Sequence, residues 1–284
     1  DFEGPEGWET KRLLLHFEGV KSAASYWLNG EAIGYHQGGM DPAEFDVTDH
    51  VGPGVNTLAV QVLRYSDGTY LEDQDMWRLS GIYRDVYLRA TPLVHIRDLY
   101  VTTELDEDYR DAELSIEAEV FNRSGEPVDG YRLRAHLFSD DSPVLDRPIE
   151  SAPFDVGIAE SDRVQLSREV KAPALWSAEH PNLYSLVAEL RDSNDALVEI
   201  VSTRMGFREV EVVDQALLVN GRAIKLNAVN SHVHHPVTGR AMDVETMRQD
   251  LVLMKQFNVN TVRTSHYPPN VEYLDLADEL GVYV

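Results

Sequence analysis

The stretch that decides the fold runs from position 224 to position 284 and reads IKLNAVNSHVHHPVTGRAMDVETMRQDLVLMKQFNVNTVRTSHYPPNVEYLDLADELGVYV. Asp243 is a good helix N-cap, and the apolar residues at 244, 247, 251 and 254 fall on one helical face. A second helical pattern ends at Gly281, a residue type suited to the position after a helix. Asn220-Gly221 predicts a hairpin turn that leads into a strand at 223–226. This strand and further apolar segments at 260–263 and 281–284 alternate with the helices, so the order is strand, helix, strand, helix, strand. This order predicts that residues 207–284 are the first βα units of a truncated (β/α)₈ TIM barrel.

The residues before this stretch predict two β domains. Residues 1–92 contain many short strands, among them 13–17, 24–28, 57–63 and 82–88, and no helical period, which indicates a jelly-roll sandwich. Asn29-Gly30 between two strand patterns is a strong hairpin signal. Residues 93–206 begin a new series of strands, and 112–120 alternate apolar with polar residues. About 110 residues of this kind are typical of an immunoglobulin-like β-sandwich.

The composition excludes several classes of protein. The chain has 284 residues, 49 Asp and Glu, 25 Lys and Arg, a net charge of −24 and no cysteine. The acidic balance argues against a nucleic acid partner, because phosphate binding needs basic patches. No apolar run approaches the roughly 18 residues that span a bilayer, so we expect no membrane partner. Without cysteine there can be no disulfide, thiolate nucleophile or cysteine-ligated zinc.

The surface charge leaves two interpretations open. Arginine outnumbers lysine by 20 to 5, and the acidic residues are spread along the chain instead of forming a tail. Such a surface repels itself unless counterions screen it, which suits a protein from a salt-rich habitat. The alternative is an ordinary acidic protein of bacterial type. The chain begins at Asp1, not at Met, and we expect it to be a fragment of a longer protein.

Histidines follow the first two strands of the predicted barrel. His232 lies in the segment SHVHHP after the first strand, and His266 lies in SHYP after the second. Active sites of TIM barrels lie at the C-terminal ends of the strands, so both side chains can face one pocket and bind sugar hydroxyls. The alternatives are a zinc site built on the His-x-His pattern and ordinary loop histidines. His234 and His235 are better interpreted as ordinary loop histidines.

A cluster of acids in the first domain is a second candidate site. The segment YLEDQDMWR at 70–78 places Glu72, Asp73 and Asp75 close together, where they can bind a cation or sugar hydroxyls. Taken alone, the segment is better interpreted as a charged, solvated loop. Trp77 is expected in a core more often than as a platform for a sugar.

The sequence resembles the β-galactosidases of glycoside hydrolase family 2 along essentially its whole length. The most specific segment is YLEDQDMWRLSGIYRDV at 70–86, together with HHP at 234–236. The remaining similar segments are FEGV at 17–20, WLNG at 27–30, LWSAEHPNLY at 175–184, GFR at 206–208 and VRTSHYP at 262–268. The first histidine of the family is usually flanked by Arg and Glu, whereas Ser231 and Val233 stand here, and Asn227 replaces a common basic residue.

The resemblance implies a set of site residues. His232 and His266 are similar to the two galactosyl-binding histidines of the family, and their separation of 34 positions matches. Asp75 corresponds to an aspartate that reaches from the sugar-binding domain, contacts the hydroxyls of galactose and binds a sodium ion. The two catalytic carboxylates and the magnesium ligands of the family are expected beyond Val284, and this chain has no Asn-Glu dipeptide of the kind that carries the acid/base.

The sequence therefore predicts part of a retaining β-galactosidase that hydrolyses terminal non-reducing β-D-galactosides such as lactose. By itself the chain is expected to be inactive. The full-length protein is expected to be a cytoplasmic homo-oligomer that uses Na⁺ and Mg²⁺. The alternatives are a sister activity such as β-glucuronidase, a non-catalytic carbohydrate-binding fragment and a zinc-dependent barrel hydrolase.

Overall fold

The computed structural model describes residues 1–4 and 6–284, which form two compact units. The first unit contains Asp1–Thr91, Ala228–Ala277 and Val284, and the second contains Pro92–Asn227 and Asp278–Tyr283. The first unit is thus discontinuous in sequence, because the chain between positions 92 and 227 belongs to the second. The predicted jelly roll and the first predicted barrel strands consequently share one unit.

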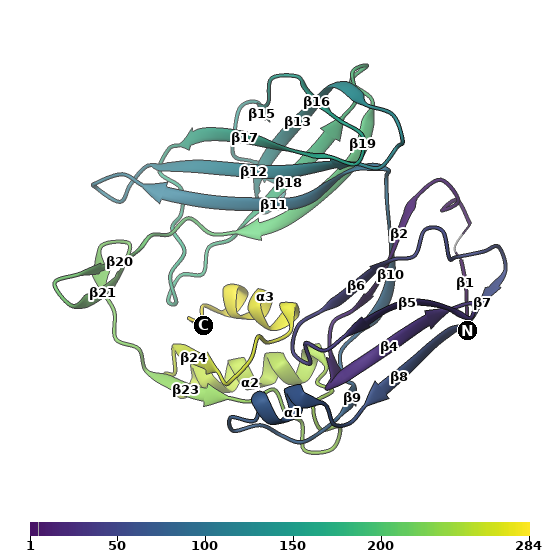
Figure 1. Ribbon diagram of the computed structural model, residues 1–284. Helices are drawn as coiled ribbons and strands as arrows, with labels where there is room; N and C mark the ends of the chain where they lie inside the picture. The colour runs from purple at the N-terminus through teal and green to yellow at the C-terminus, as the bar shows by residue number, and fades with distance from the viewer. Residues whose placement is uncertain (5) are drawn as a thin grey trace. The chain divides into compact units, whose positions relative to one another are not determined.

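The N-terminal part of the first unit is a β-sandwich (Figure 1). One sheet has the order β10-β2-β6 and the other has the order β5-β4-β8, and both are antiparallel. Their apolar faces meet in a core that includes Leu15 and Phe17 of β2 and Tyr26 and Leu28 of β4. The strands of the two sheets and of the short pairs β1-β7 and β3-β9 are Phe2–Glu3 (β1), Arg12–Phe17 (β2), Val20–Lys21 (β3), Ala23–Leu28 (β4), Glu31–His36 (β5), Ala43–Asp46 (β6), Val55–Asn56 (β7), Leu58–Leu63 (β8), Gly81–Ile82 (β9) and Val86–Thr91 (β10).

The predicted Asn-Gly hairpin between β4 and β5 is confirmed. Asn29 and Gly30 both have positive φ, 53° and 86°, which is the backbone of the turns that suit the twist of paired strands. Asparagine tolerates this left-handed conformation and glycine adopts it without steric cost. The hairpin brings Leu28 opposite Glu31 in the antiparallel register.

One sequence prediction in this sandwich is wrong, and one short helix was missed. The predicted strand 82–88 is broken into β9 and β10, because Tyr83 and Arg84 turn away from the sheet and make contacts elsewhere. The short helix α1, Asp67–Leu71, was not predicted, since five residues are too few to show a helical period. Ser66 is its N-cap, in a capping box with Thr69.

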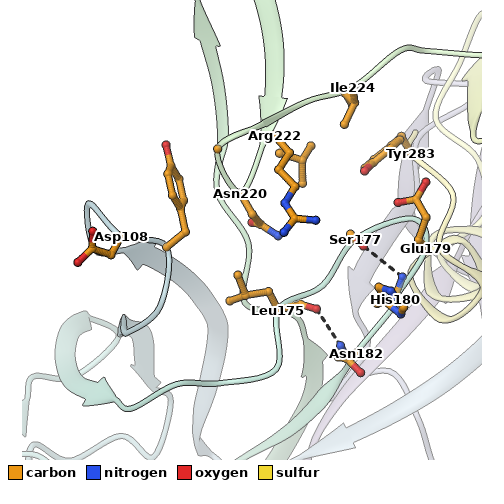
Figure 2. A pocket seen from close by; sticks show the side chains of 13 residues that line it. Asp108, Leu175, Ser177, Glu179, His180, Asn182, Asn220, Arg222, Ile224 and Tyr283 are labelled. Carbon is orange, nitrogen blue, oxygen red and sulfur yellow. Dashed lines mark hydrogen bonds between the residues drawn. The ribbon is translucent and has the colours of Figure 1, made fainter.

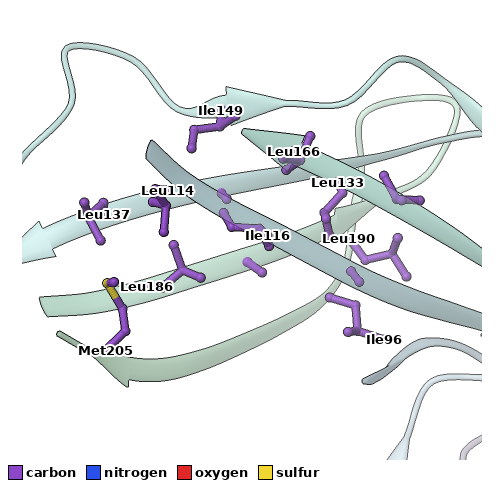
Figure 3. Packing of buried hydrophobic residues seen from close by; sticks show 14 of the residues in the cluster. Ile96, Leu114, Ile116, Leu133, Leu137, Ile149, Leu166, Leu186, Leu190 and Met205 are labelled. Atoms are coloured by element: carbon purple, nitrogen blue, oxygen red, sulfur yellow. The ribbon is translucent and has the colours of Figure 1, made fainter. Parts of the chain in front are cut away.

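The second unit is built around a β-sandwich with a large apolar core (Figure 3). Buried residues alternate with partly exposed ones along β12 and β18, as the sequence predicted for 112–120. Leu114 and Ile116 of β12 are almost completely buried, as are Leu186 and Leu190 of β18, on the opposite sheet. The sheets are β11-β12-β17 and β14-β13-β18-β19, with β15 and β16 paired to β13, and the strands are Val94–Leu105 (β11), Ala112–Asn122 (β12), Val128–Ser139 (β13), Ser142–Pro143 (β14), Ile149–Glu150 (β15), Phe154–Val156 (β16), Ser161–Val170 (β17), Tyr184–Arg191 (β18) and Leu197–Met205 (β19).

A three-stranded meander follows the sandwich in the same unit. It consists of β20 (Val210–Val213), β21 (Ala216–Val219) and β22 (Arg222–Ala223). The predicted turn at Asn220 and Gly221 is confirmed, since both residues have positive φ. The predicted strand 223–226 is largely wrong, because pairing ends at Ala223.

The βα part of the first unit begins at β23, Ala228–Ser231. This strand pairs in parallel with β24, Thr261–Thr264, and helix α2, Val244–Gln256, connects the two. Asp243 caps α2 by accepting a hydrogen bond from the backbone N–H of Thr246 at 2.7 Å, as predicted. Helix α3, Val271–Leu280, ends before Gly281, which has a φ of 71°.

The strand predicted at 281–284 is not formed, since Gly281 lies in a turn and Tyr283 is a single bridge residue. Among the helices of the described residues, none has the length and apolar character needed to cross a bilayer.

Candidate functional site

The parallel pairing of β23 and β24 brings the two predicted histidines together. The register places Ser231 beside Thr264, so both strands end at the same edge of the pair. His232 follows directly after β23, and His266 stands two residues after β24. Their rings lie 5.9 Å apart between centroids and are nearly perpendicular, at 88°. The two histidines therefore lie side by side at this edge of the strand pair.

The neutral form of His232 is favoured by its surroundings. Burial lowers the pKa of His232, and the positive charges of His266 and Arg240 lower it further, while Asp75 acts in the opposite direction. The hydroxyl of Tyr267 lies 3.4 Å from Nδ1 of His232. Burial raises the pKa of Tyr267, so this hydroxyl is protonated at neutral pH. A neutral imidazole next to a hydroxyl can both donate and accept a hydrogen bond, which suits sugar hydroxyls.

Asp75 belongs to the sandwich of the same unit and lies beside the two histidines. Its Oδ2 lies 3.6 Å from Nε2 of His266, which is an ion pair when the histidine is protonated. The Asp75 side chain remains 84% exposed, so its carboxylate has room for further partners. The residue has a φ of 48°, a left-handed conformation in the turn between α1 and β9. All three predicted site residues therefore lie together.

A stack of two aromatic rings borders this group and was missed in the sequence. The Trp77 and His234 rings lie 4.5 Å apart between centroids at an angle of 15°, and the Trp77 edge also approaches His232 at 6.0 Å. The expectation that Trp77 belongs to a core is wrong, since its side chain is 44% exposed. Nothing in the spacing of positions 77 and 234 reveals the stack, because it joins two loops that are distant in sequence.

His235 has a local structural role. Its Nδ1 accepts hydrogen bonds from the backbone N–H groups of Val237 and Thr238, both at 3.1 Å. Its backbone N–H and C=O pair with those of Gly239, at 2.7 and 3.0 Å. His235 thus closes the turn that follows β23, in agreement with its interpretation as an ordinary loop histidine.

A small cavity adjoins the group on the side of His266. It has a volume of about 300 Å³ and is lined by the apolar Met40, Met76 and Pro268 and the polar Asp41, Glu72 and Gln74, besides His266 and Tyr267. A space of this size with mixed polar and apolar walls is typical of small-molecule sites.

A larger cavity of about 740 Å³ lies within the second unit (Figure 2). None of the predicted site residues lines it. Several of its polar groups support the surrounding loops: Asn182 donates to the carbonyl of Leu175 at 2.9 Å, and Asn220 donates to the carbonyl of Trp176 at 3.1 Å. These side chains stabilise the fold of this unit, and the cavity is separate from the histidine group.

The zinc alternative receives no support from the side-chain arrangement. Within residues 1–4 and 6–284, no group of three or more His, Asp or Glu side chains is arranged to hold a metal ion. The His232 and His266 rings meet edge to face, with no third zinc-binding side chain completing a set.

Comparisons with known proteins identify the class to which this arrangement belongs. The family model described as the sugar binding domain of glycosyl hydrolases family 2 matches residues 1–92, a second model of the family matches 94–208, and the model of its TIM barrel domain matches 210–284. The chain belongs to glycoside hydrolase family 2. The predicted multidomain fold, with a jelly roll, an immunoglobulin-like sandwich and the start of a TIM barrel, is confirmed.

The relatives within this family are named as glycosidases. The chain is 42% identical over 279 residues to a beta-galactosidase of Priestia megaterium, covering 98% of this chain and 27% of that protein. It is 45% identical over 276 residues to a beta-galactosidase of Yersinia enterocolitica, covering 94% of this chain and 26% of that protein. A solved structure of Bacteroides uniformis beta-glucuronidase 2 matches with a TM-score of 0.90 and 28% identity, over 99% of this chain and 34% of that one. The chain thus spans about a quarter of the length of these curated relatives.

Proposed function

We propose that the protein containing this chain is a retaining β-galactosidase, which hydrolyses terminal non-reducing β-D-galactosides, and that this chain contributes binding residues for the galactosyl group. The observation that carries the proposal is the convergence of Asp75, His232 and His266 at the ends of two adjacent parallel strands. Such residues can hydrogen-bond to several hydroxyls of one sugar ring. Bonds that tighten in the transition state raise kcat as well as lowering KM.

A neutral galactoside suits this site better than a glucuronide. Asp75 adds a negative charge to the site, and like charges repel, so a neutral galactoside is favoured over an anionic glucuronide. Arg240, a nearby cation, is buried and already donates to the carbonyl of Trp77 at 2.6 Å. The higher identity to proteins named as beta-galactosidases, 42–45% against 28% for the beta-glucuronidase, favours the same substrate.

Hydrolysis of the glycosidic bond requires carboxyl groups in addition to Asp75, His232 and His266. Retaining glycosidases use two carboxyl groups about 5–5.5 Å apart, one as nucleophile and one as acid/base. The group formed by Asp75, His232 and His266 contains one carboxylate, and Asp75 faces a binding histidine. The proposal therefore assigns binding to these residues and places the catalytic pair outside the 284 residues. The proposal likewise places the magnesium ligands of the full-length protein outside these 284 residues.

Asp75 fits a sodium site in the chemistry of its donor atoms. Hard cations prefer oxygen ligands, and the exposed Asp75 carboxylate offers two oxygens beside the histidines that are proposed to bind the sugar hydroxyls. Bound sodium would supply positive charge that orients a hydroxyl of the galactosyl group. Asp75 itself would hold the ion, while His232 and His266 bind hydroxyls directly.

The test is an assay of the purified full-length protein with matched chromogenic β-galactosides and β-glucuronides. We expect kcat/KM to be at least a hundredfold higher for the galactoside. A preference for the glucuronide would replace the proposal with the sister activity. Binding of galactose without turnover by the full-length protein would support a carbohydrate-binding protein instead. The same preparation, analysed by sedimentation, tests the proposed homo-oligomer, and fractionation of its native cells tests the proposed cytoplasmic location.

A further inference from the structure

We infer that Arg240 is a positioning residue, which holds the loop bearing Asp75 against the histidines; this inference rests on the proposed function. The loop is defined as residues 72–80 and is called the Asp75 loop. Arg240 lies in the turn after β23 and is 4% exposed. It acts on Asp75 through the backbone of the Asp75 loop.

The guanidinium of Arg240 binds the Asp75 loop directly. One terminal nitrogen donates a hydrogen bond of 2.6 Å to the carbonyl of Trp77. The other terminal nitrogen lies 3.7 Å from the sulfur of Met40. The guanidinium carbon also lies 5.3 Å from the ring centroid of Tyr267 and 5.8 Å from that of Tyr83. The cation is thus fixed between two ring faces while it donates to the loop.

The electrostatics argue against a role in packing alone. Burial lowers the pKa of Arg240, which reflects the free-energy cost of placing a charge there, and no carboxylate of the described residues offsets this cost in an ion pair. The aromatic faces and the carbonyl dipole stabilise the cation instead. An apolar side chain would fill the same space without this cost. The arginine supplies hydrogen bonds that an apolar side chain cannot make, to the carbonyl of Trp77 and to the side chain of Tyr267.

Besides the bond from Arg240, the Asp75 loop is held by the stack of Trp77 on His234 and by a hydrogen bond of 3.3 Å from the Ser80 hydroxyl to the carbonyl of Arg64. It lies between α1 and β9 and forms no helix or strand, and most of its side chains are exposed. Its partly buried Met76 packs against a small cluster of Met40, Val233 and Tyr267. The Trp77 carbonyl is two residues from Asp75, a span of at most about 7 Å, so a shift of this carbonyl moves the carboxylate.

The turn that carries Arg240 is itself rigid. The paired backbone groups of His235 and Gly239 close it, and the Thr238 hydroxyl donates to the carbonyl of Ala241. Gly239 has a φ of 70°, and a Cβ at this position would lie 3.0 Å from a methyl carbon of Leu79 in the Asp75 loop. The turn and the loop are therefore in close contact, and Arg240 adds a directed bond to this contact.

The test uses Arg240→Met and Arg240→Lys in the full-length protein, with Asp75→Asn as the partner in a double-mutant cycle. Methionine retains the packing among Met40, Tyr83 and Tyr267 but cannot donate to Trp77. We expect kcat/KM for a chromogenic galactoside to fall about ten- to hundredfold, because misplacement of a binding group by about 1 Å has this effect. The sodium concentration for half-maximal activity should rise in both variants. Combined with Asp75→Asn, Arg240→Met should add less than twofold.

Arg191→Met is the matched control. Arg191 likewise donates to a backbone carbonyl, that of Asp195 at 2.7 Å, in the sandwich of the second unit. This variant should change neither the sodium response nor kcat/KM. Unchanged sodium dependence in folded Arg240 variants, or effects that multiply with those of Asp75→Asn, would overturn the positioning role.

Hydrogen exchange separates the failure of this inference from that of the proposed function. We expect faster exchange of amides 73–79 in Arg240→Met, with unchanged exchange in β2 and β10. This readout needs no substrate, so it decides the role of Arg240 even if the wild-type protein does not hydrolyse galactosides. Equal exchange rates of amides 73–79 in the wild type and the variant would refute the inference. If Arg240→Met does not fold, the same comparison is made with Arg240→Lys.

Discussion

His266→Ala in the full-length protein is the most direct test of the histidine group. The structural cost of the change is small: the imidazole contacts Asp75 at 3.6 Å, beyond hydrogen-bond length, and meets the His232 ring at 5.9 Å. A partly exposed contact of this kind contributes at most about 1 kcal/mol to stability. The melting temperature should therefore change by only a few degrees.

The catalytic cost should be much larger. The variant loses one hydrogen bond to a sugar hydroxyl and the alignment of the Asp75 carboxylate, which together contribute about 2–4 kcal/mol by the usual values for neutral and charged hydrogen bonds. At 1.36 kcal/mol for each factor of ten, kcat/KM for a galactoside falls about 30- to 1,000-fold.

Steady-state kinetics and thermal unfolding of the same preparation measure both effects. His180→Ala, a change in an exposed histidine of the second unit, is the control and should leave kinetics unchanged. A folded His266→Ala protein with kcat/KM within threefold of wild type would refute the reasoning. Loss of one equivalent of zinc from the variant would favour the zinc hydrolase instead.

Four further predictions follow from the same structure and sequence. Asp75→Asn should raise the sodium concentration for half-maximal activity, with Asp73→Asn as control, and an unchanged titration contradicts the sodium role. Burial lowers the pKa of His232, so the folded state binds fewer protons than the unfolded state in acid. The free energy of unfolding should therefore fall as pH drops below about 6.5, and this fall should be smaller in His232→Asn. The 284-residue chain, with a net charge of −24, should melt at a higher temperature in molar KCl than at low salt, and a flat response contradicts the screening argument. The same chain should not hydrolyse a chromogenic galactoside, and turnover that co-purifies with it would place the catalytic carboxylates within these residues.

Local patterns allowed much of the fold to be predicted from the sequence. The alternation in β12 appears because one face of the strand is buried in a core. Asp243 and the Asn-Gly turns were recognised because their side chains and backbones act on neighbouring residues. The interruption between β9 and β10 could not be predicted, since it depends on Tyr83 donating to the carbonyl of Gly39 and Arg84 donating to that of Pro268.

In the candidate site, too, features set by local sequence could be predicted, whereas contacts between distant loops could not. His232 and His266 were predicted to lie together because each follows a parallel strand, and Asp75 was added only through the family resemblance. The stack of Trp77 on His234 and the bond from Arg240 to Trp77 left no signal in the sequence. Both join loops separated by more than 150 positions, and no periodicity connects such residues.

The discontinuity of the first unit affects how the protein is made on the ribosome. Asp75 is synthesised 157 residues before His232, and Pro92–Asn227 of the intervening chain belong to the second unit. At about 5–20 residues per second, roughly 10 to 30 s pass before the binding partners of the Asp75 loop emerge. During this interval the nascent sandwich presents Met76 and Trp77 without their partners Val233 and His234. Until residues 233 and 234 emerge, Met76 and Trp77 are therefore accessible to proteases and to chaperones that bind nascent chains.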